Sequence, residues 1–174
     1  LLIADTVAGD TGELRCWSLL ISPPDCSDGG GQCETCVPNF SGRFNADMPS
    51  TTTRLVRNGV ASGCGSAKVC PTVITGARLF YRVHLITNSG PATCSSVVLS
   101  DLCRASSLRL HAAAYLNSYN PADPCANYLG DTGSELTTGS TSFSFAAPEN
   151  AVIAIVVSSP VTATTCPISY GLQL

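Results

Sequence analysis

Short runs of alternating apolar and polar residues recur along most of the chain, whereas helical periodicity is scarce. A period of two is typical of strands that bury one face. Residues 78–87 (RLFYRVHLIT) show it most clearly, with Val83 and Leu85 on the apolar face and Arg82 and His84 on the polar face. We therefore expect a half-buried strand in this segment.

Other segments have the same strand-like character and are separated by turns rich in Gly, Pro, Asn and Asp. They are residues 94–100, 107–116, 142–146, 151–158 and 168–174, with residues 1–7 and 14–21 as further candidates near the N-terminus. APEN at residues 147–150 predicts a hairpin, and His111 falls on the polar face of its strand. Short strands at this spacing predict an all-β fold, an antiparallel β-sandwich or a jelly-roll-like domain.

The first part of the chain has a different texture. Residues 23–53 are loop-like, rich in Gly and Pro, and hold three cysteines. We therefore predict two parts: an N-terminal strand and disulfide-rich arm at residues 1–58, and the β-sandwich domain at residues 59–174.

Ten cysteines lie along the whole chain, an even number. They are Cys16, Cys26, Cys33, Cys36, Cys64, Cys70, Cys94, Cys103, Cys125 and Cys166. Such a set favours a disulfide framework, which persists in oxidising compartments, so we predict a secreted or cell-surface protein. Proximity and order along the chain suggest the pairs 64–70, 94–103 and 125–166. The four N-terminal cysteines would pair among themselves in an order that sequence does not decide.

Cys33 and Cys36 have the CxxC spacing of redox and metal sites. A thioredoxin-like pair opens a helix after a strand, but the surrounding sequence GGGQCETCVPN is loop-like on both sides. A zinc site needs a second pair or nearby histidines, and the chain contains no second CxxC. Structural disulfides are therefore the preferred interpretation.

Charge is sparse: 12% of the residues are charged, the net charge is −3, and Lys and Arg do not cluster. We expect no nucleic-acid partner, because binding nucleic acid needs a basic patch. No apolar run reaches the roughly 18–20 residues that span a bilayer, so we expect no membrane span. The chain begins at Leu1 without a signal-peptide pattern, which favours a mature form or a fragment.

Five segments from about residue 62 to the end follow one another in a characteristic order. They are SGCGSAKVCP, FYRVHLITNSGPATCSSVVLSDLC, AAAYLNSYNPADPCANYLGDTGS, SFSFAAPENAVIAIVV and CPISYGLQL. Together they resemble bacterial secreted β-sandwich modules similar to the pre-peptidase C-terminal (PPC-like) domains. The resemblance implies a binding, spacing or stabilising module of a surface protein, and it does not cover the first 60 residues.

Candidate catalytic residues are few. His84 and His111 both fall within predicted strands, and the sequence has no GxSxG nucleophile elbow. Neither histidine stands in a loop beside a distinctive Ser or Cys, as a catalytic base would. We therefore expect surface or interface histidines and no enzymatic activity.

Oxygen-bearing side chains gather near residue 130. Asp123, Asn127, Asp131 and Glu135 carry the ligand atoms that Ca²⁺ prefers. The EF-hand order is absent, and turn-forming Asp and Asn explain the segment equally well. Calcium at Asp123, Asn127 and Asp131 is thus an open alternative, and no other cofactor is expected.

Two surface features remain. Asn39-Phe40-Ser41 is a glycosylation sequon in a segment that we expect to be a surface loop. Trp17, Tyr115, Tyr119 and Tyr128 could form a platform for carbohydrate stacking, although most aromatic residues of a sandwich belong to its core.

The preferred function is a non-enzymatic extracellular structural subunit that assembles into a surface filament or pilus-like fibre. The short apolar segment with Leu1, Leu2, Ile3 and Val7 could add as a strand to the sheet edge of the next subunit. Head-to-tail contacts that do not close generate a filament, whereas folding back onto its own sheet is equally compatible with the sequence. The alternative function is a calcium-stabilised accessory or adhesion module that binds a cell-surface polysaccharide or protein.

Overall fold

The computed structural model describes residues 39–101, 109–160 and 169–173. Within these ranges every regular element is a β-strand and none is a helix. The strands are β1 (Asn39–Arg43), β2 (Ser50–Leu55), β3 (Val73–Asn88), β4 (Thr93–Asp101), β5 (His111–Leu116), β6 (Tyr128–Asp131), β7 (Ser140–Ala147), β8 (Ala151–Ser159) and β9 (Ser169–Gln173). The predicted all-β fold class is therefore confirmed.

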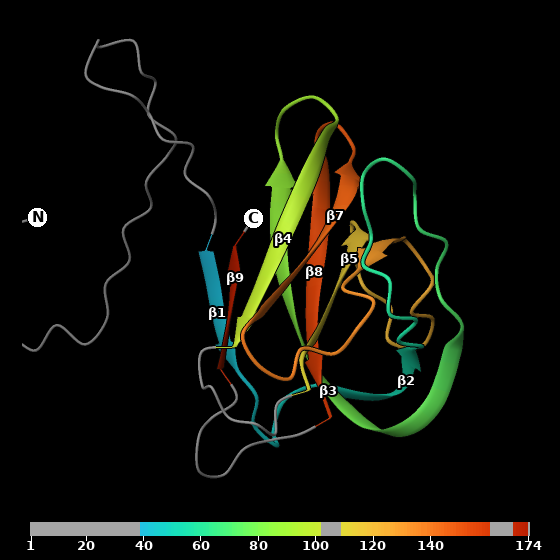
Figure 1. The fold of residues 1–174 in the computed structure, drawn as a ribbon, viewed down its shortest axis with the longest axis vertical. Helices are drawn as coiled ribbons and strands as arrows, with labels where there is room; N and C mark the ends of the chain where they lie inside the picture. Colours follow the sequence, from blue (N-terminus) through green and yellow to red (C-terminus); the bar gives the residue numbers. More distant parts are fainter. Residues whose placement is uncertain (1–38, 102–108, 161–168, 174) are drawn as a thin grey trace, which may run out of the picture. The chain divides into compact units, whose positions relative to one another are not determined.

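The strands form two antiparallel sheets (Figure 1). The four-stranded sheet has the order β1-β9-β4-β7, and the five-stranded sheet has the order β2-β3-β8-β5-β6. The long strand β3 pairs with β2 from Val73 to Phe80 and with β8 from Phe80 to Asn88. The two partners of β3 therefore overlap only at Phe80.

Side chains from both sheets meet in one hydrophobic core. The four-stranded sheet supplies Val97, Leu99, Phe143 and Phe145, and the five-stranded sheet supplies Ala112, Ile153, Ile155 and Val157. All eight are almost fully buried. Burying one large apolar side chain contributes about 1.5–3 kcal/mol, so this core is the main source of the attraction between the sheets.

A second cluster covers the outer face of the five-stranded sheet. Tyr115, Ala113, Ala154, Val156 and Leu55 are buried there, against side chains of the loop that follows β5. Strand β5 is consequently buried on both faces, and so is His111 at its start. The predicted polar face of this strand is wrong, because the loop supplies a second apolar layer that strand alternation cannot reveal.

The predicted apolar face of β3 is only partly buried. Leu79 is buried, whereas Val83 is 39% and Leu85 is 61% exposed. His84, predicted on the exposed face, is half-buried with its ring 5.1 Å from the ring of Phe40 on β1. The difference arises because the second cluster covers only the start of this face, while the opposite face packs toward the other sheet.

Three further expectations differ from the structure. Strands β7 and β8 lie in different sheets, so the residues around Pro148 connect two layers and do not form a hairpin. Strand β1 and the start of β2 lie within residues 23–53, which the sequence predicts to be a loop, and β6 is a strand that the sequence does not predict. Among the described residues, hydrogen-bonded sheet is present from Asn39 onward.

Candidate functional site

The connection between β2 and β3, residues 56–72, lies beside an outermost strand of each sheet. We call it the clasp. Its base closes where the Val56 N–H donates to the Thr72 carbonyl over 2.8 Å. Figure 1 shows the clasp as the teal-to-green loop that rises from β2 and returns to β3. It is the longest described connection between two strands, and its contacts decide how the edge strands beside it are covered.

Ser62 in the clasp joins the outermost strands of the two sheets, β6 and β7. Its N–H donates to the Asp131 carbonyl over 2.9 Å, and its carbonyl accepts from the Ser144 N–H over 2.9 Å. Its hydroxyl accepts from the Asp131 N–H over 2.8 Å. Free N–H and C=O groups on an edge strand invite pairing with another chain. The clasp therefore protects both edges on this side.

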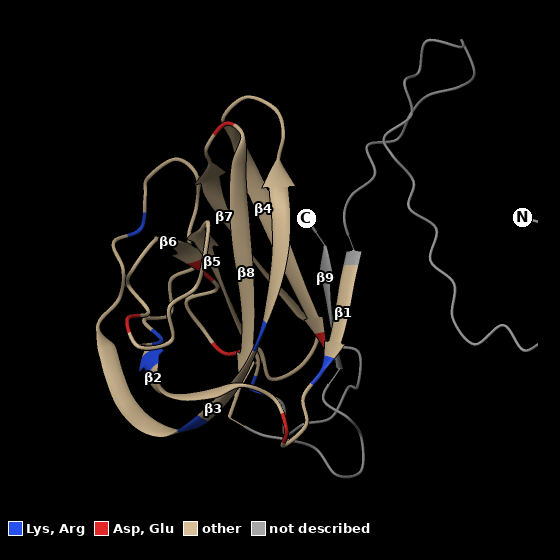
Figure 2. Cartoon of the chain, turned by 180° about the vertical axis from the view of Figure 1, so that it is seen from behind, with Lys and Arg blue, Asp and Glu red and all other residues tan. Residues whose placement is uncertain are grey.

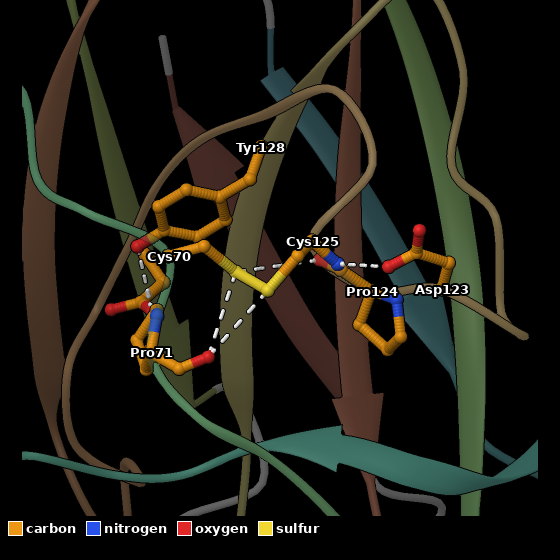
Figure 3. The surroundings of a disulfide bond; sticks show 7 residues. Cys70, Pro71, Asp123, Pro124, Cys125 and Tyr128 are labelled. Atoms are coloured by element: carbon orange, nitrogen blue, oxygen red, sulfur yellow. Dashed lines mark hydrogen bonds between the residues drawn. A yellow bond between two sulfur atoms is a disulfide. The ribbon is translucent and has the colours of Figure 1, made fainter.

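Two disulfides fasten the clasp, one toward each sheet. Cys64 bonds to Cys94 on β4, and Cys70 bonds to Cys125 in the loop after β5. Figure 3 shows the second bridge between Pro71 and Pro124. These bonds contradict the predicted pairs 64–70, 94–103 and 125–166, because the clasp brings together residues 30 and 55 positions apart. Cys103, Cys166 and the four N-terminal cysteines lie outside the described residues.

A buried ion pair holds the clasp to β6. The Asp131 side chain is fully buried, and its Oδ1 accepts from Lys68 Nζ over 2.6 Å and from the Gly133 N–H over 2.6 Å. Its Oδ2 accepts from the Tyr128 hydroxyl over 2.9 Å. Removing one partner of a buried ion pair typically costs about 3–5 kcal/mol. Lys68 was not among the candidate residues, because it lies 63 positions before Asp131 and no sequence motif connects the two.

On the opposite side of the five-stranded sheet, the second half of β3 has no neighbouring strand among the described residues, because β2 ends its pairing at Phe80. The Tyr81 N–H donates to the Pro49 carbonyl over 3.0 Å, so the main chain of Tyr81 points away from β8. In an antiparallel pair, alternate residues point the same way. Val83, Leu85 and Thr87 therefore direct their N–H and C=O groups outward along an open edge.

This open edge is also apolar. Val83 and Leu85 are exposed on the outer face of the sheet, and Ile86 is only partly buried at the margin of the core. Exposed apolar edge strands are the kind that soluble proteins normally shield with charge, proline or a covering segment. The residues that carry this property are those of the open edge, Val83–Thr87.

A second candidate site lies beside the end of β2, where three arginines surround Glu135. Arg109 Nε lies 2.8 Å from Glu135 Oε2, while Arg54 Nη1 and Arg57 Nε lie 3.4 Å and 3.9 Å from Oε1. The residues come from three separated parts of the chain, so the sequence contains no signal for the cluster. In Figure 2, blue segments stand at β2 and in the adjoining loops.

Arg57 of this cluster and the nearby His111 both have buried polar atoms. Arg57 Nη1 donates to the Leu55 carbonyl over 2.6 Å, but its Nε and Nη2 have no hydrogen-bond partner within the described residues. Nε2 of His111 has none there either. Burial lowers the pKa of Arg57 to about 10, and burial together with Arg57, Lys68 and Arg54 lowers the pKa of His111 well below 6.5. His111 is therefore neutral and surrounded by cations.

The candidate calcium ligands have separate roles in the structure. Asp123 Oδ1 accepts from the Cys125 N–H over 3.2 Å, Asn127 has a left-handed backbone with φ of 62°, and Asp131 is paired with Lys68. No group of three or more His, Cys, Asp or Glu side chains in the described ranges could hold a metal ion. Calcium stays a prediction, without support from this geometry.

The other candidate residues are distributed as follows. Tyr115, Tyr119 and Tyr128 belong to the second cluster, with ring centroids 4.9 Å and 6.2 Å from that of Tyr115, so they are packed together as core and do not form a flat platform. Asn39 begins strand β1 and does not stand in the expected loop. Trp17 lies outside the described residues, and so do the donor-strand residues Leu1, Leu2, Ile3 and Val7.

Comparisons with protein-family models, with curated proteins and with solved structures find no match to this chain. The resemblance to PPC-like modules therefore stays a prediction. Among the elements of the described ranges, no helix is long and apolar enough to cross a membrane. The two disulfides are compatible with an extracellular protein.

Proposed function

We propose that the chain is a non-enzymatic extracellular structural subunit with a β-sandwich fold, and that it assembles by strand addition. The apolar segment Leu1–Val7 of one subunit would pair with the open edge Val83–Thr87 of the next. Because this contact joins two different surfaces, its repetition gives a filament where the rotation between successive subunits does not close into a ring. The observation that carries the proposal is the apolar outward edge of the second half of β3, which pairs with β8 on one side and has no neighbouring strand on the other among the described residues.

Three features support this edge as the acceptor. The clasp covers β6 and β7, which directs association away from that side of the molecule. The segment Leu1–Val7 has about the length of the open edge, so it could use each outward N–H and C=O group of Val83, Leu85 and Thr87. Its aliphatic side chains would cover the exposed Val83 and Leu85, as in other cases of strand addition to a sheet edge.

The placement of the histidines supports a function without catalysis. His84 packs against Phe40. His111 is buried and lines a cavity of only about 20 Å³, which is far smaller than the clefts that bind small molecules. The disulfide-fastened clasp suits a subunit that must stay folded outside the cell.

The test compares assembly of the full chain with that of three variants. We expect the full chain to form concentration-dependent oligomers by light scattering and fibres by negative-stain microscopy. Deleting residues 1–10 removes the donor, and Leu85→Lys places a charge at the acceptor edge, so both should give monomers. Val69→Lys is the matched control, because Val69 is 86% exposed and lies outside this edge, and it should assemble normally.

Two results would overturn the proposal. A full chain that stays monomeric at every concentration would rule out assembly between subunits. Normal assembly of Leu85→Lys would show that the open edge of β3 is not the acceptor.

A further inference from the structure

An open cleft of about 450 Å³ lies beside the end of β2. Its lining combines the three arginines and Glu135 with small and aliphatic residues: Arg54, Val56, Arg57, Gly59, Ile74, Arg109, Ser134 and Glu135. Clefts that bind small molecules typically measure about 300–1,000 Å³ and combine apolar walls with a few convergent polar groups. The size and the lining of this cleft therefore match those of a small-molecule site.

The charge of the cleft is unbalanced. Three guanidinium groups face one carboxylate, so the lining carries a formal charge of +2 in a protein with a net charge of −3. Lys68 and Asp131 neutralise one another nearby and do not change this difference. A structural network would be expected to match its charges, and this one leaves two positive charges without a counter-ion among the lining residues.

Burial makes the excess charge more costly. The Arg57 side chain is only 13% exposed and shares the single carboxylate of Glu135 with two other arginines. Burial lowers the pKa of Arg57 to about 10, although Glu135 acts in the opposite direction. Coulomb interactions are stronger in such a poorly solvated region than in water, so an anion in the cleft would be attracted by Arg57 even without touching it.

Arg54 and Arg109 supply the accessible donors. Their side chains are 32% and 55% exposed. Toward Glu135, Arg54 uses Nη1 and Arg109 uses Nε. The other N–H groups of both side chains have no hydrogen-bond partner among the described residues, so a ligand could use them. The planar arrangement of N–H groups on a guanidinium matches the two oxygens of a carboxylate.

We propose that this cleft binds the carboxylate of a small organic acid through Arg54 and Arg109, with Arg57 adding to the positive field. A sugar acid and an aliphatic dicarboxylate carry the same group, so the experiment separates these two sources. The site is distinct from the open edge of β3, and the inference does not depend on assembly.

The experiment is a titration followed by the backbone amide signals of ¹⁵N-labelled full-length chain at low ionic strength. The probes are galacturonate, glutarate, neutral glucose and inorganic sulfate. We expect a carboxylate to shift the amide signals of Gly59 and Ser134 in the cleft, and glucose to leave them unchanged. The stronger of galacturonate and glutarate identifies the source of the carboxylate.

Variants locate the site. Arg54→Gln combined with Arg109→Gln should weaken binding at least tenfold, because both accessible donors are removed. Arg82→Gln is the matched control, since Arg82 is an exposed arginine on β3 outside the cleft, and it should bind as the unmodified chain does. Circular dichroism of each variant checks that the fold is retained.

The proposal is overturned if neither carboxylate shifts these signals, or if a folded double variant binds as tightly as the unmodified chain. Sulfate binding more tightly than both carboxylates would also overturn it, because the site would then select a tetrahedral oxyanion.

Discussion

At the scale of single residues, Gly133 shows how closely the clasp approaches the sheet. Its backbone has φ of 68°, and a Cβ at this position would lie 2.1 Å from the Val60 carbonyl oxygen. No rotation of a side chain could relieve this contact, because the obstacle is main chain. The glycine is therefore required both by its backbone conformation and by the space left by the clasp.

We expect Gly133→Ala to destabilise the protein strongly. The left-handed backbone alone costs a non-glycine residue about 1–2 kcal/mol, and the clash adds the displacement of the clasp. Gly139→Ala is the matched control, because Gly139 has φ of 76° with nothing within 4 Å of the added atom. Urea unfolding should give a clearly larger loss for Gly133→Ala, and equal losses would contradict the close approach.

A second prediction at this scale concerns pH and His111. Its pKa in the folded protein is lowered well below 6.5, mainly by burial. The unfolded chain therefore takes up a proton first as the pH falls. Above about pH 7 His111 is neutral in both states and does not change the stability. Below the pKa of the unfolded chain, the free energy of unfolding decreases by up to about 1.4 kcal/mol per pH unit.

Denaturant unfolding between pH 7.5 and 5 measures this effect. His111→Gln should flatten the decrease in stability toward acid pH. His84→Gln is the comparison, because burial and Arg82 lower the pKa of His84 in the same direction while its side chain is only half-buried. Parallel pH profiles for the unmodified chain and His111→Gln would show that His111 does not titrate in this way.

At the scale of elements, the two edges of the five-stranded sheet differ: the clasp covers the edge at β6, whereas the second half of β3 has no covering strand among the described residues. On one side, the clasp satisfies the outer hydrogen-bonding groups of β6 and binds its carboxylate at Asp131. On the other, β2 is too short to accompany β3 beyond Phe80. A single short strand thus leaves the open edge on which the proposed assembly rests.

We expect each disulfide of the clasp to contribute about 4 kcal/mol to stability, since the entropic model scales with the logarithm of the loop that is closed. Those loops span 30 residues for Cys64–Cys94 and 55 for Cys70–Cys125. Replacing either pair by alanine should lower the urea midpoint. Loss of Cys64–Cys94 should also speed amide hydrogen exchange at Ser62 and Ser144.

A peptide map made without reduction supplies the independent check on these two bonds. It should contain the linked peptides Cys64–Cys94 and Cys70–Cys125. Recovery of Cys64 linked to Cys70 would instead support the pairing expected from proximity in the sequence.

At the scale of the whole molecule, most strands can be located from neighbouring residues in the sequence, whereas the contacts between distant segments cannot. Strand-like runs bounded by turn residues located β4, β7 and β8 to within about two residues of their observed ends, because strand and turn signals are properties of consecutive residues. β2 was missed, since the run STTTRL has strand-forming threonines but no apolar alternation. The loop-like appearance of residues 50–53 therefore reflects their polarity and not their conformation.

The candidate sites depended on contacts that no local pattern encodes. Arg54, Arg109 and Glu135 come from separate parts of the chain. The bridge between Leu110 and Leu136 brings Arg109 beside Glu135, and the Arg54 side chain on β2 reaches the same carboxylate. The same holds for Lys68 and Asp131. Their residue types were visible in the sequence, but their distances were not.

The sequence by itself determined the all-β class, the positions of most strands and the presence of disulfides, because these follow from neighbouring residues and composition. The tertiary structure decided which face of β3 is covered, which cysteines of the clasp bond, and where an open edge and a positive cleft remain. Those features arise from pairing and burial between distant segments, since a strand's alternation specifies two faces but not what packs on each of them.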